Sequence, residues 1–232
     1  MNSEWRARYE TAIEVAKEAG QLAFRYFQSS FEVEWKQDQS PVTVADRESE
    51  QLIRDRLLQR FSDDGILGEE HGDQEGSSGF RWILDPIDGT RSFVRGIPIW
   101  ATLIGLEYKG EQIAGVVEVP AMGDSYRALR GDGAFRNDQP IHVSSVRELS
   151  ESMLYYSSLH WFIGAGRHED FLNLVRRTQR QRGYGDFYGF VLVAQGSGEA
   201  MVEHGVSIWD VAAIKPLIEE AGGRFGDWEG KP

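Results

Sequence analysis

Apolar residues recur every three or four positions over two stretches of the chain, residues 4–28 and 46–60. A helix with this spacing carries one apolar stripe, so we expect two amphipathic helices that pack on a core. Shorter apolar runs at 65–68 and 80–84 are typical of buried strands, and the alternating residues 31–36 are typical of another strand. The first part of the chain therefore mixes long helices with short strands.

Three further strands are predicted in a row, at residues 99–108, 111–119 and 124–130. Turn-forming pairs separate them, Lys109-Gly110 between the first two and Gly123-Asp124 between the second and third. Strands joined by such short turns are antiparallel neighbours, so we expect a meander in a large sheet.

The pattern changes after about residue 140, where shorter strands and helices alternate. The expected elements are a strand at 153–156, a helix at 169–180, an apolar helical run at 189–195, a strand at 200–203 and a helix at 208–221 that Gly222-Gly223 ends. This predicts a mixed α/β fold, with an α+β lobe over residues 1–140 and an α/β lobe over 141–232. With 232 residues, the two lobes can pack as one unit.

The chain is acidic, with a formal net charge of −12, and it contains no cysteine. Nucleic-acid phosphates are bound by basic patches, so we do not expect a nucleic-acid partner. Residues 1–6 are too polar for a signal peptide, and no apolar run approaches the roughly 20 residues that cross a bilayer. We therefore expect a cytoplasmic protein without a membrane partner.

The most informative chemistry lies in the segment Trp82 to Thr90. An apolar run ends in Asp85, a proline follows, and Asp88 comes three residues after the first acid. Two carboxylates at the end of a buried strand can bind hard divalent cations. If Gly89 and Thr90 open a helix, their amides point at an anion beside those cations. A turn with a helix cap explains Asp88 but not Asp85, so this segment indicates phosphate chemistry.

Other acids have a good structural explanation when each is taken alone. Asp46 and Asp210 occupy the third position after Thr43 and Ser207, where an acid completes a helix cap. Glu69, with Glu70 beside it, fits a solvated turn. Taken together, five carboxylates could hold two or three ions about 4 Å apart, the spacing used for in-line phosphoryl displacement. They are Asp46, Glu69, Asp85, Asp88 and Asp210.

Several common catalytic arrangements are missing from the sequence. The five histidines are scattered, and no pair has metal-ligand spacing. The chain has neither a G-x-x-x-x-G-K-[ST] loop nor a G-x-S-x-G elbow. Sequence spacing by itself does not show that the acids converge.

The motifs resemble those of the inositol monophosphatase family of magnesium-dependent phosphatases. The combination of D-P-I-D-G-T at 85–90 with W-D-V-A-A at 209–213 is highly specific. The other matching pieces occur in family order: Lys36 with Ser40 to Thr43 and Asp46, Gly65 to Glu70, and Glu219 to Gly223. The resemblance implies a layered αβαβα sandwich.

The second half is most similar to the histidinol-phosphate phosphatase branch of this family. The matching stretches are 185–189, 192–196 and 199–203, followed by Phe225 and Asp227-Trp228. In inositol-directed members the position of Asp186 is commonly small and uncharged. An acid there, helped by Glu203, favours a cationic ligand over a neutral polyol. The alternative is that Asp186 caps the helix that follows.

The resemblance also implies a set of metal ligands. Glu69, Asp85 and the carbonyl of Ile87 would bind a first Mg²⁺, and Asp85, Asp88 and Asp210 a second. A third, weaker ion would lie near Glu69, and Mn²⁺ is an alternative metal.

The implied reaction needs no covalent phospho-enzyme. Thr90, linked to Asp46, would act with Glu69 to orient and deprotonate a metal-bound water. The amides of Gly89 and Thr90 would hold phosphate oxygens. The residues expected to contact the substrate are Asp88, Gly89, Thr90, Asp186, Glu203 and Asp210.

We expect hydrolysis of a small phosphate monoester, with L-histidinol phosphate as the first choice. The alternatives are an inositol or broad sugar-phosphate phosphatase and, less favoured, a phosphatase for adenosine bisphosphate. An alternative of another class is a regulatory binding protein that keeps the fold but has little activity. Relatives are mostly dimers, so a homodimer is expected. Family members usually carry a further strand and helix after the position of Trp228. Either this chain is short or its tail is absent here, and a shortened sheet edge could be covered by a partner subunit.

Overall fold

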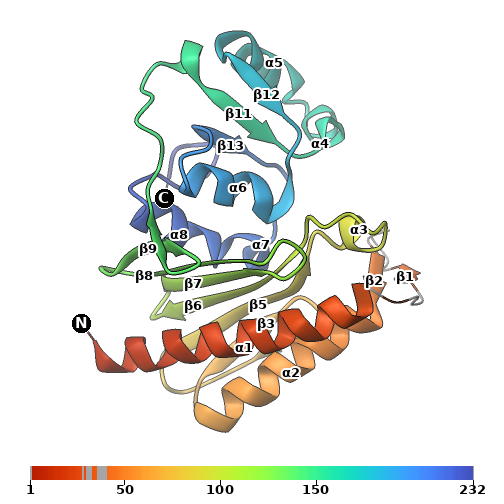
Figure 1. The fold of residues 1–232 in the computed structure, drawn as a ribbon, viewed down its shortest axis with the longest axis vertical. Helices are drawn as coiled ribbons and strands as arrows, with labels where there is room; N and C mark the ends of the chain where they lie inside the picture. The colour runs from red at the N-terminus through yellow and green to blue at the C-terminus, as the bar shows by residue number, and fades with distance from the viewer. Residues whose placement is uncertain (1, 28, 30–32, 36–40, 232) are drawn as a thin grey trace.

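The computed structural model describes residues 2–27, 29, 33–35 and 41–231. Part of the strand predicted at 31–36 and the motif residues Lys36 and Ser40 lie outside these described residues. Five layers are visible in Figure 1, and they form the αβαβα sandwich predicted from the resemblance.

The first two layers are a helix pair and a large sheet. Helices α1 (Ser3–Phe27) and α2 (Val44–Arg60) lie side by side against one face of an eight-stranded sheet (Figure 1). The sheet has the order β10-β9-β8-β7-β6-β5-β3-β4 and is antiparallel except between β3 and β5. Its strands are β3 (Gly65–Gly68), β4 (Gly72–Gln74), β5 (Phe80–Asp88), β6 (Ala101–Tyr108), β7 (Glu111–Val119), β8 (Asp124–Leu129), β9 (Gly133–Arg136) and β10 (Gln139–Ile141). Strands β1 (Val33–Trp35) and β2 (Pro41–Thr43) pair antiparallel in a separate two-stranded sheet.

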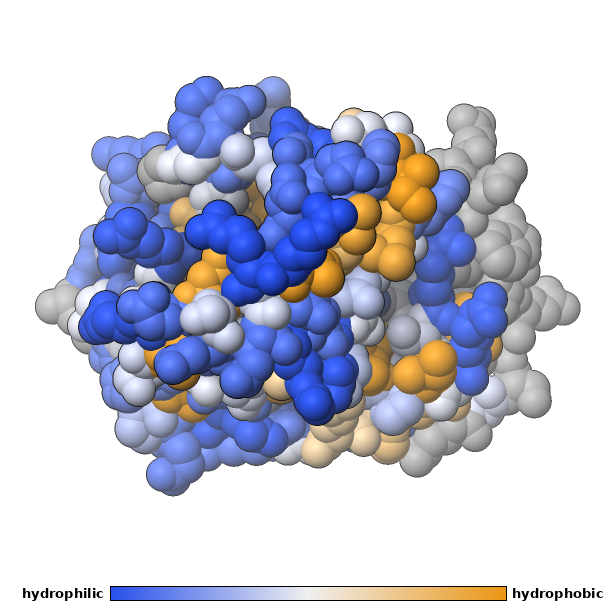
Figure 2. Space-filling model, turned by 90° about the horizontal axis from the view of Figure 1, so that it is seen from above, coloured by the Kyte–Doolittle hydropathy of each residue, from blue (hydrophilic) through white to orange (hydrophobic). Residues whose placement is uncertain are grey.

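The other face of the large sheet carries the remaining three layers. Helices α6 (Asp186–Ala194), α7 (Ile208–Val211) and α8 (Ile214–Glu220) form the middle layer. Above them lies a parallel sheet with the order β12-β11-β13, formed by Arg180–Arg182, Met153–Tyr156 and Ala200–Val202. Helices α4 (Leu159–Gly164) and α5 (His168–Arg177) complete the outer layer. Seen from above, this end is largely hydrophilic, with separate apolar patches (Figure 2).

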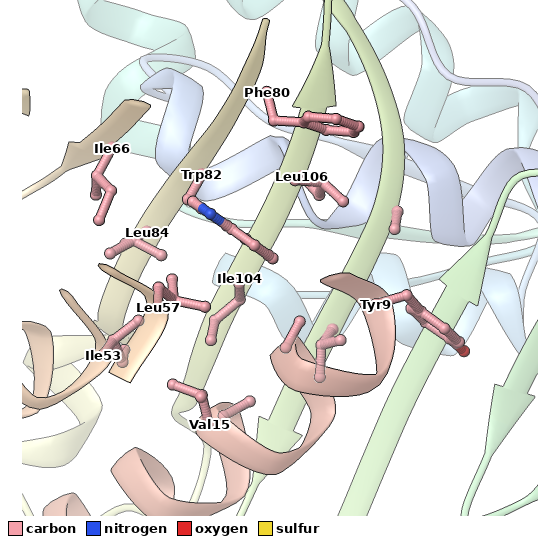
Figure 3. Close-up of a cluster of buried hydrophobic side chains, with 14 of the residues drawn as sticks. Tyr9, Val15, Ile53, Leu57, Ile66, Phe80, Trp82, Leu84, Ile104 and Leu106 are labelled. Carbon is pink, nitrogen blue, oxygen red and sulfur yellow. The ribbon is translucent and has the colours of Figure 1, made fainter. Parts of the chain in front are cut away.

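The first helix pair and the sheet share a hydrophobic core. Figure 3 shows Tyr9 and Val15 from α1 and Ile53 and Leu57 from α2 converging on the side chains of β5 and its neighbours. Trp82, the third residue of that strand, is fully buried. Because alternate residues of β5 are held in this core, the direction of the strand and the place where its acidic end emerges are fixed.

The helix predicted at 208–221 is wrong as one element, because the structure divides it into α7 and α8. Pro216, in the first turn of α8, lacks the N–H that would bond the carbonyl of Ala212, so a break one turn before it is favoured over a continuous helix. The chain at the break lies against two glycines of the sheet: a Cβ on Gly115 would lie 1.9 Å from the carbonyl oxygen of Ala213. The chain between α7 and α8 therefore packs directly on the backbone of β6 and β7.

Other differences are smaller. The helix predicted at 169–180 ends at Arg177, and Arg180 already belongs to β12. Helix α6 begins at Asp186, three residues before the predicted run, and α2 begins at Val44. Elements that the sequence analysis did not predict are β2, β4, β9, β10, β12, α4 and a 3₁₀ helix at Leu149–Glu151. They are all short, so apolar periodicity has too few positions in which to show.

Candidate metal centre

A bulge at the end of β5 places Asp85 and Asp88 on the same side of the strand. Residues three apart in a regular strand point to opposite faces. Here Asp85 pairs with Leu103 and Asp88 with Ala101, so β5 contains one more residue than β6 over this interval. The extra residue resets the alternation. Proline is compatible with this place because a bulge leaves a position without a ladder hydrogen bond, and Pro86 keeps its carbonyl paired with the Thr102 hydroxyl at 2.9 Å.

Asp210 joins these two acids from the other half of the chain. One carboxylate oxygen from each of Asp85, Asp88 and Asp210 can be chosen so that all three lie within 4.8 Å of one another. Asp210 also closes the predicted helix cap, since its Oδ2 accepts a 2.6 Å hydrogen bond from the amide of Ser207. The cap and the cluster are therefore compatible, because the cap holds the carboxylate in place at the start of α7.

Crowding of buried carboxylates makes this cluster suited to a cation. Burial raises the pKa of Asp85 well above its usual range, and the charges of Glu69 and Asp88 raise it further. Burial likewise raises the pKa of Asp88, with the charges of Asp186 and Asp210 adding to the effect. For Asp210, burial raises the pKa to about 6. Bound divalent cations would replace the protons and remove the repulsion, and carboxylate oxygens are the ligands that Mg²⁺ prefers.

Glu69 lies in the turn between β3 and β4, next to this cluster. Its charge raises the pKa of Asp85, of Asp210 and of Asp46, so its carboxylate lies near all three acids. It is half-buried, and its amide donates a 3.2 Å hydrogen bond to the carbonyl of Leu84. Glu69 is not within the 4.8 Å group formed by the three aspartates. Glu69 therefore does not lie in a fully solvated turn, which is the alternative interpretation of this acid.

Thr90 and Asp46 adjoin the cluster from α3 (Thr90–Phe93) and α2. The Thr90 hydroxyl lies 3.0 Å from the carbonyl oxygen of Ile87 and 3.5 Å from Oδ1 of Asp46. The predicted cap at the start of α2 is also present, since Oδ2 of Asp46 accepts hydrogen bonds from the Thr43 amide and hydroxyl at 2.7 and 2.6 Å. Burial raises the pKa of Asp46 to about 7. Asp46 thus uses one oxygen for the cap and turns the other toward Thr90.

Gly89 begins the short helix as predicted. Its φ of 88° lies in the left-handed region, and its carbonyl accepts hydrogen bonds from the amides of Ser92 and Phe93. A Cβ at this position would lie 2.9 Å from the carbonyl oxygen of Ile99. Only glycine fits both the backbone angle and the space.

A second acidic pair, Asp186 and Glu203, lies beside the cluster. The position at which a Cβ on Gly89 would lie is 3.4 Å from Oδ2 of Asp186, which places this carboxylate over the turn. Glu203 accepts a hydrogen bond from the Ser157 hydroxyl through Oε1, whereas its buried Oε2 has no hydrogen-bond partner within the described part of the chain. Burial, together with the charge of Asp186, raises the pKa of Glu203 to about 7. Among the residues that the structure describes, Oε2 of Glu203 has no hydrogen-bond donor as a partner.

The proposal that Asp186 merely caps a helix is wrong. The capping residue of α6 is Gly185, and Asp186 is the first helical residue. Its φ of 54° is unusual for a residue other than glycine. Desolvation raises the pKa of Asp186, while the charge of Arg91 lowers it. Asp186 is itself exposed, and an exposed acid in an unusual backbone conformation beside a cluster of acids is more typical of a binding group than of a cap.

Sequence reasoning missed three groups around the site. Ser157 holds Glu203, Arg91 provides positive charge near Asp186, and the Phe187 amide donates to Asp88 at 2.5 Å. None of them belongs to a motif, and the last is a backbone group. Only the spatial arrangement of α3, α6 and β11 shows that they belong together.

A carboxylate cluster of this kind, beside a turn that begins a helix, has the chemistry of a metal-dependent phosphatase. The comparisons with known proteins agree. The model of the inositol monophosphatase family matches residues 4–232. The histidinol-phosphatase of Chlorobaculum parvum is 42% identical over 96% of this chain and 86% of its own length. The inositol-1-monophosphatase of Mesorhizobium japonicum is 36% identical, over 94% of this chain and 84% of its own length.

A solved structure shows the same fold. The extragenic suppressor protein suhB from Bartonella henselae superposes with a TM-score of 0.91 at 31% identity, covering 97% of this chain and 89% of that one. The chain belongs to the inositol monophosphatase family, and it is a phosphatase. No helix in the described residues has both the length and the apolar character of a membrane span.

Proposed function

We propose that this protein is a Mg²⁺-dependent phosphatase that hydrolyses L-histidinol phosphate to L-histidinol and phosphate. The observation that carries the substrate is the acidic pair of exposed Asp186 and half-buried Glu203 beside the carboxylate cluster. Histidinol phosphate carries an ammonium group and an imidazole that can be protonated. A carboxylate whose pKa is raised by another acid is stabilised by a nearby cation, so the pair favours this ligand over a neutral polyol.

The proposed metal ligands follow from the geometry of the cluster. Asp85, Asp88 and Asp210, with Glu69 and the Ile87 carbonyl, would hold two or three Mg²⁺ ions, and Mn²⁺ has similar ligand preferences. When bound, the ions supply a water with a lowered pKa and positive charge for the leaving oxygen.

The rest of the chemistry comes from the residues of the chain. Thr90 orients the attacking water, because its hydroxyl lies between the Ile87 carbonyl and Asp46. Glu69, whose carboxylate lies near the cluster, takes the proton with Asp46 and Thr90 behind it. The amides of Gly89 and Thr90 hold phosphate oxygens in the turn. Asp88, Gly89, Thr90, Asp186, Glu203 and Asp210 form the proposed substrate contacts.

The two lobes would divide these tasks. Residues 1–140 supply most metal ligands and the phosphate turn, and residues 141–232 supply Asp186 and Glu203 for selectivity. Buried residues of β6, β7 and β8 pack with α6 and α8 in one cluster, which supports the proposal that both lobes act as one unit.

We also propose a cytoplasmic homodimer with neither nucleic acid nor membrane as a partner. Exposed apolar side chains of α4, including Ile163 at 63% exposure, support a self-association surface, and sedimentation velocity measures it.

A phosphate-release panel with the purified full chain tests the substrate. L-Histidinol phosphate should give a kcat/KM at least about tenfold above those of inositol 1-phosphate, simple sugar phosphates and adenosine bisphosphate. A preference for inositol phosphate would favour the alternative of an inositol monophosphatase, which the 36% identical relative supports. A protein inert on the whole panel would favour a regulatory binding protein.

A further inference from the structure

Glu50, which belongs to no recognised motif, is buried beneath the turn that carries Glu69. It lies on α2 with no exposed surface. Its Oε2 accepts a 2.7 Å hydrogen bond from the amide of Glu70, and its Oε1 accepts one from the amide of His71 at 3.1 Å. The backbone amides of the two residues that follow Glu69 are therefore both hydrogen-bonded to one carboxylate.

Arg54, one helical turn further along α2, completes this arrangement. Its Nε donates a 2.8 Å hydrogen bond to Oε1 of Glu50, and its guanidinium also donates to the carbonyl of Gly72. The pair thus contacts the turn at three successive residues, 70, 71 and 72. Gly68, just before the turn, fits closely as well, since a Cβ there would lie 2.0 Å from Oε1 of Glu50. The backbone on both sides of Glu69 follows the shape of this buried pair.

The chain contains a second buried pair that serves as an internal comparison. Arg8 donates to both oxygens of Asp64, at 2.8 and 2.9 Å, and Asp64 also accepts hydrogen bonds from Trp82 and Ser78. Asp64 directly precedes β3, whereas the turn held by Glu50 directly follows it. The two acids therefore secure opposite ends of one strand, more than about 13 Å apart along four residues. Only the Glu50 end adjoins the carboxylate cluster.

We propose that Glu50, held by Arg54, is a positioning residue that sets the β3–β4 turn so that the Glu69 carboxylate faces the metal site. This inference rests on the proposed function, namely that the cluster binds divalent cations. Glu50 acts through the backbone of Glu70 and His71 and does not contact the ions. Residues that orient metal ligands typically change metal affinity by about 10- to 100-fold when they are replaced.

The experiment is a Mn²⁺ titration of the full chain followed by electron paramagnetic resonance. In Glu50→Gln the side-chain NH₂ group would face one of the backbone N–H groups of Glu70 and His71. Two donors cannot pair, so the turn loses its fixed position. We expect the Kd of the Glu69-dependent ion to rise by about tenfold or more, and the Mg²⁺ concentration for half-maximal activity to rise with it. The matched control Asp64→Asn should lower the melting temperature and leave both metal quantities unchanged.

A double variant shows whether Glu50 acts through Glu69. Glu69→Gln removes the proposed ligand, so adding Glu50→Gln to it should weaken Mn²⁺ binding no further. An additional loss of the same size as in the single variant would overturn the positioning role. Normal Mn²⁺ affinity in folded Glu50→Gln would overturn it as well.

Glu50→Asp keeps the test decisive if Glu50→Gln does not fold. Aspartate preserves the charge opposite Arg54 but is one methylene too short to reach both amides, so its Kd should also rise. Unchanged affinity in Glu50→Asp, or failure of both variants to fold, would make Glu50 a purely structural residue. Wild-type protein that binds no Mn²⁺ would overturn the proposed function itself, whereas wild-type binding with unaltered variants overturns only this inference.

Discussion

The backbone amide of Phe187 donates a 2.5 Å hydrogen bond to Oδ2 of Asp88, joining residues that are 99 positions apart. This bond crosses from the first residues of α6 to the end of β5, so it links Asp186, the proposed selectivity residue, to the carboxylate cluster. The carboxylate of Asp88 is at once a proposed ligand and the anchor of the helix that carries Asp186. Metal binding and substrate selection should therefore be coupled at this position.

Replacing Asp88 should abolish most activity without unfolding the protein. Asparagine keeps an oxygen that can accept the Phe187 amide but removes one negative charge from a crowded cluster. Because residues behind metal ligands already matter by about 10- to 100-fold, loss of a direct ligand should lower kcat/KM by about 100-fold or more. The metal-free variant should melt no lower than the wild type at neutral pH. A normal rate at saturating Mg²⁺ would refute the ligand assignment.

The metal-free protein should lose stability as the pH rises. Burial raises the pKa of Asp46 from 3.8 and that of Glu203 from 4.5, each to about 7, so the folded state holds protons that the unfolded chain has already released. The stabilisation is fully present below pH 3.8 and is lost as the pH passes through about 7. Melting temperatures in EDTA should therefore fall between pH 5 and about 8.

Two controls separate this effect from the general repulsion of an acidic chain. Glu203→Gln should flatten part of the fall, because it removes one of the titrating groups. Mg²⁺ should raise the melting temperature more at about pH 8 than at pH 5, because cations take the place of protons. A melting temperature in EDTA that does not change over this range would contradict the raised pKa values.

Asp186→Asn should change which substrate is preferred. Asparagine tolerates the left-handed backbone at this position, where φ is 54°, so the fold should persist. Loss of a charged partner for an ammonium group corresponds to about 1.5–3 kcal/mol, or roughly 10- to 150-fold in kcat/KM for L-histidinol phosphate. The rate on inositol 1-phosphate should change by less than about threefold. Equal losses on both substrates would assign Asp186 to the metal cluster and not to selectivity.

Gly89→Ala should damage both stability and activity. The residue combines a φ of 88° with a Cβ position 2.9 Å from the carbonyl oxygen of Ile99. Gly96→Ala is a matched control, since Gly96 has a φ of 70° but no atom within 4 Å of its Cβ position. Urea denaturation should show a loss of about 1–2 kcal/mol for Gly96→Ala and more for Gly89→Ala. Identical losses with full activity in both would contradict the tight fit of the phosphate turn.

Much of the fold could be predicted because local patterns and tertiary packing agree. The long amphipathic helix at the start of the chain and the meander of β6, β7 and β8 are both confirmed. The helix at 208–221 was not predicted correctly, because its break depends on Pro216 and on glycines of strands about 100 residues away. Apolar spacing within the segment carries no information about those strands.

In the candidate site, too, local sequence patterns predicted some features, and others depend on tertiary contacts. Asp85 and Asp88 stood out because they interrupt an apolar strand, and the structure brings them together with Asp210 as expected. The bulge that allows it follows from pairing with β6, which the sequence does not display. Glu50 carried no signal, because a Glu and an Arg four residues apart on a helix are also typical of a solvated surface. Only burial shows that this pair supports the site.

The dependence of phosphate release on Mg²⁺ is the most direct test of the account. EDTA-treated protein should release almost no phosphate from L-histidinol phosphate, and added Mg²⁺ should restore the rate along a saturable curve. A rate that is indifferent to EDTA, or the absence of any rate at every Mg²⁺ concentration, would contradict the account.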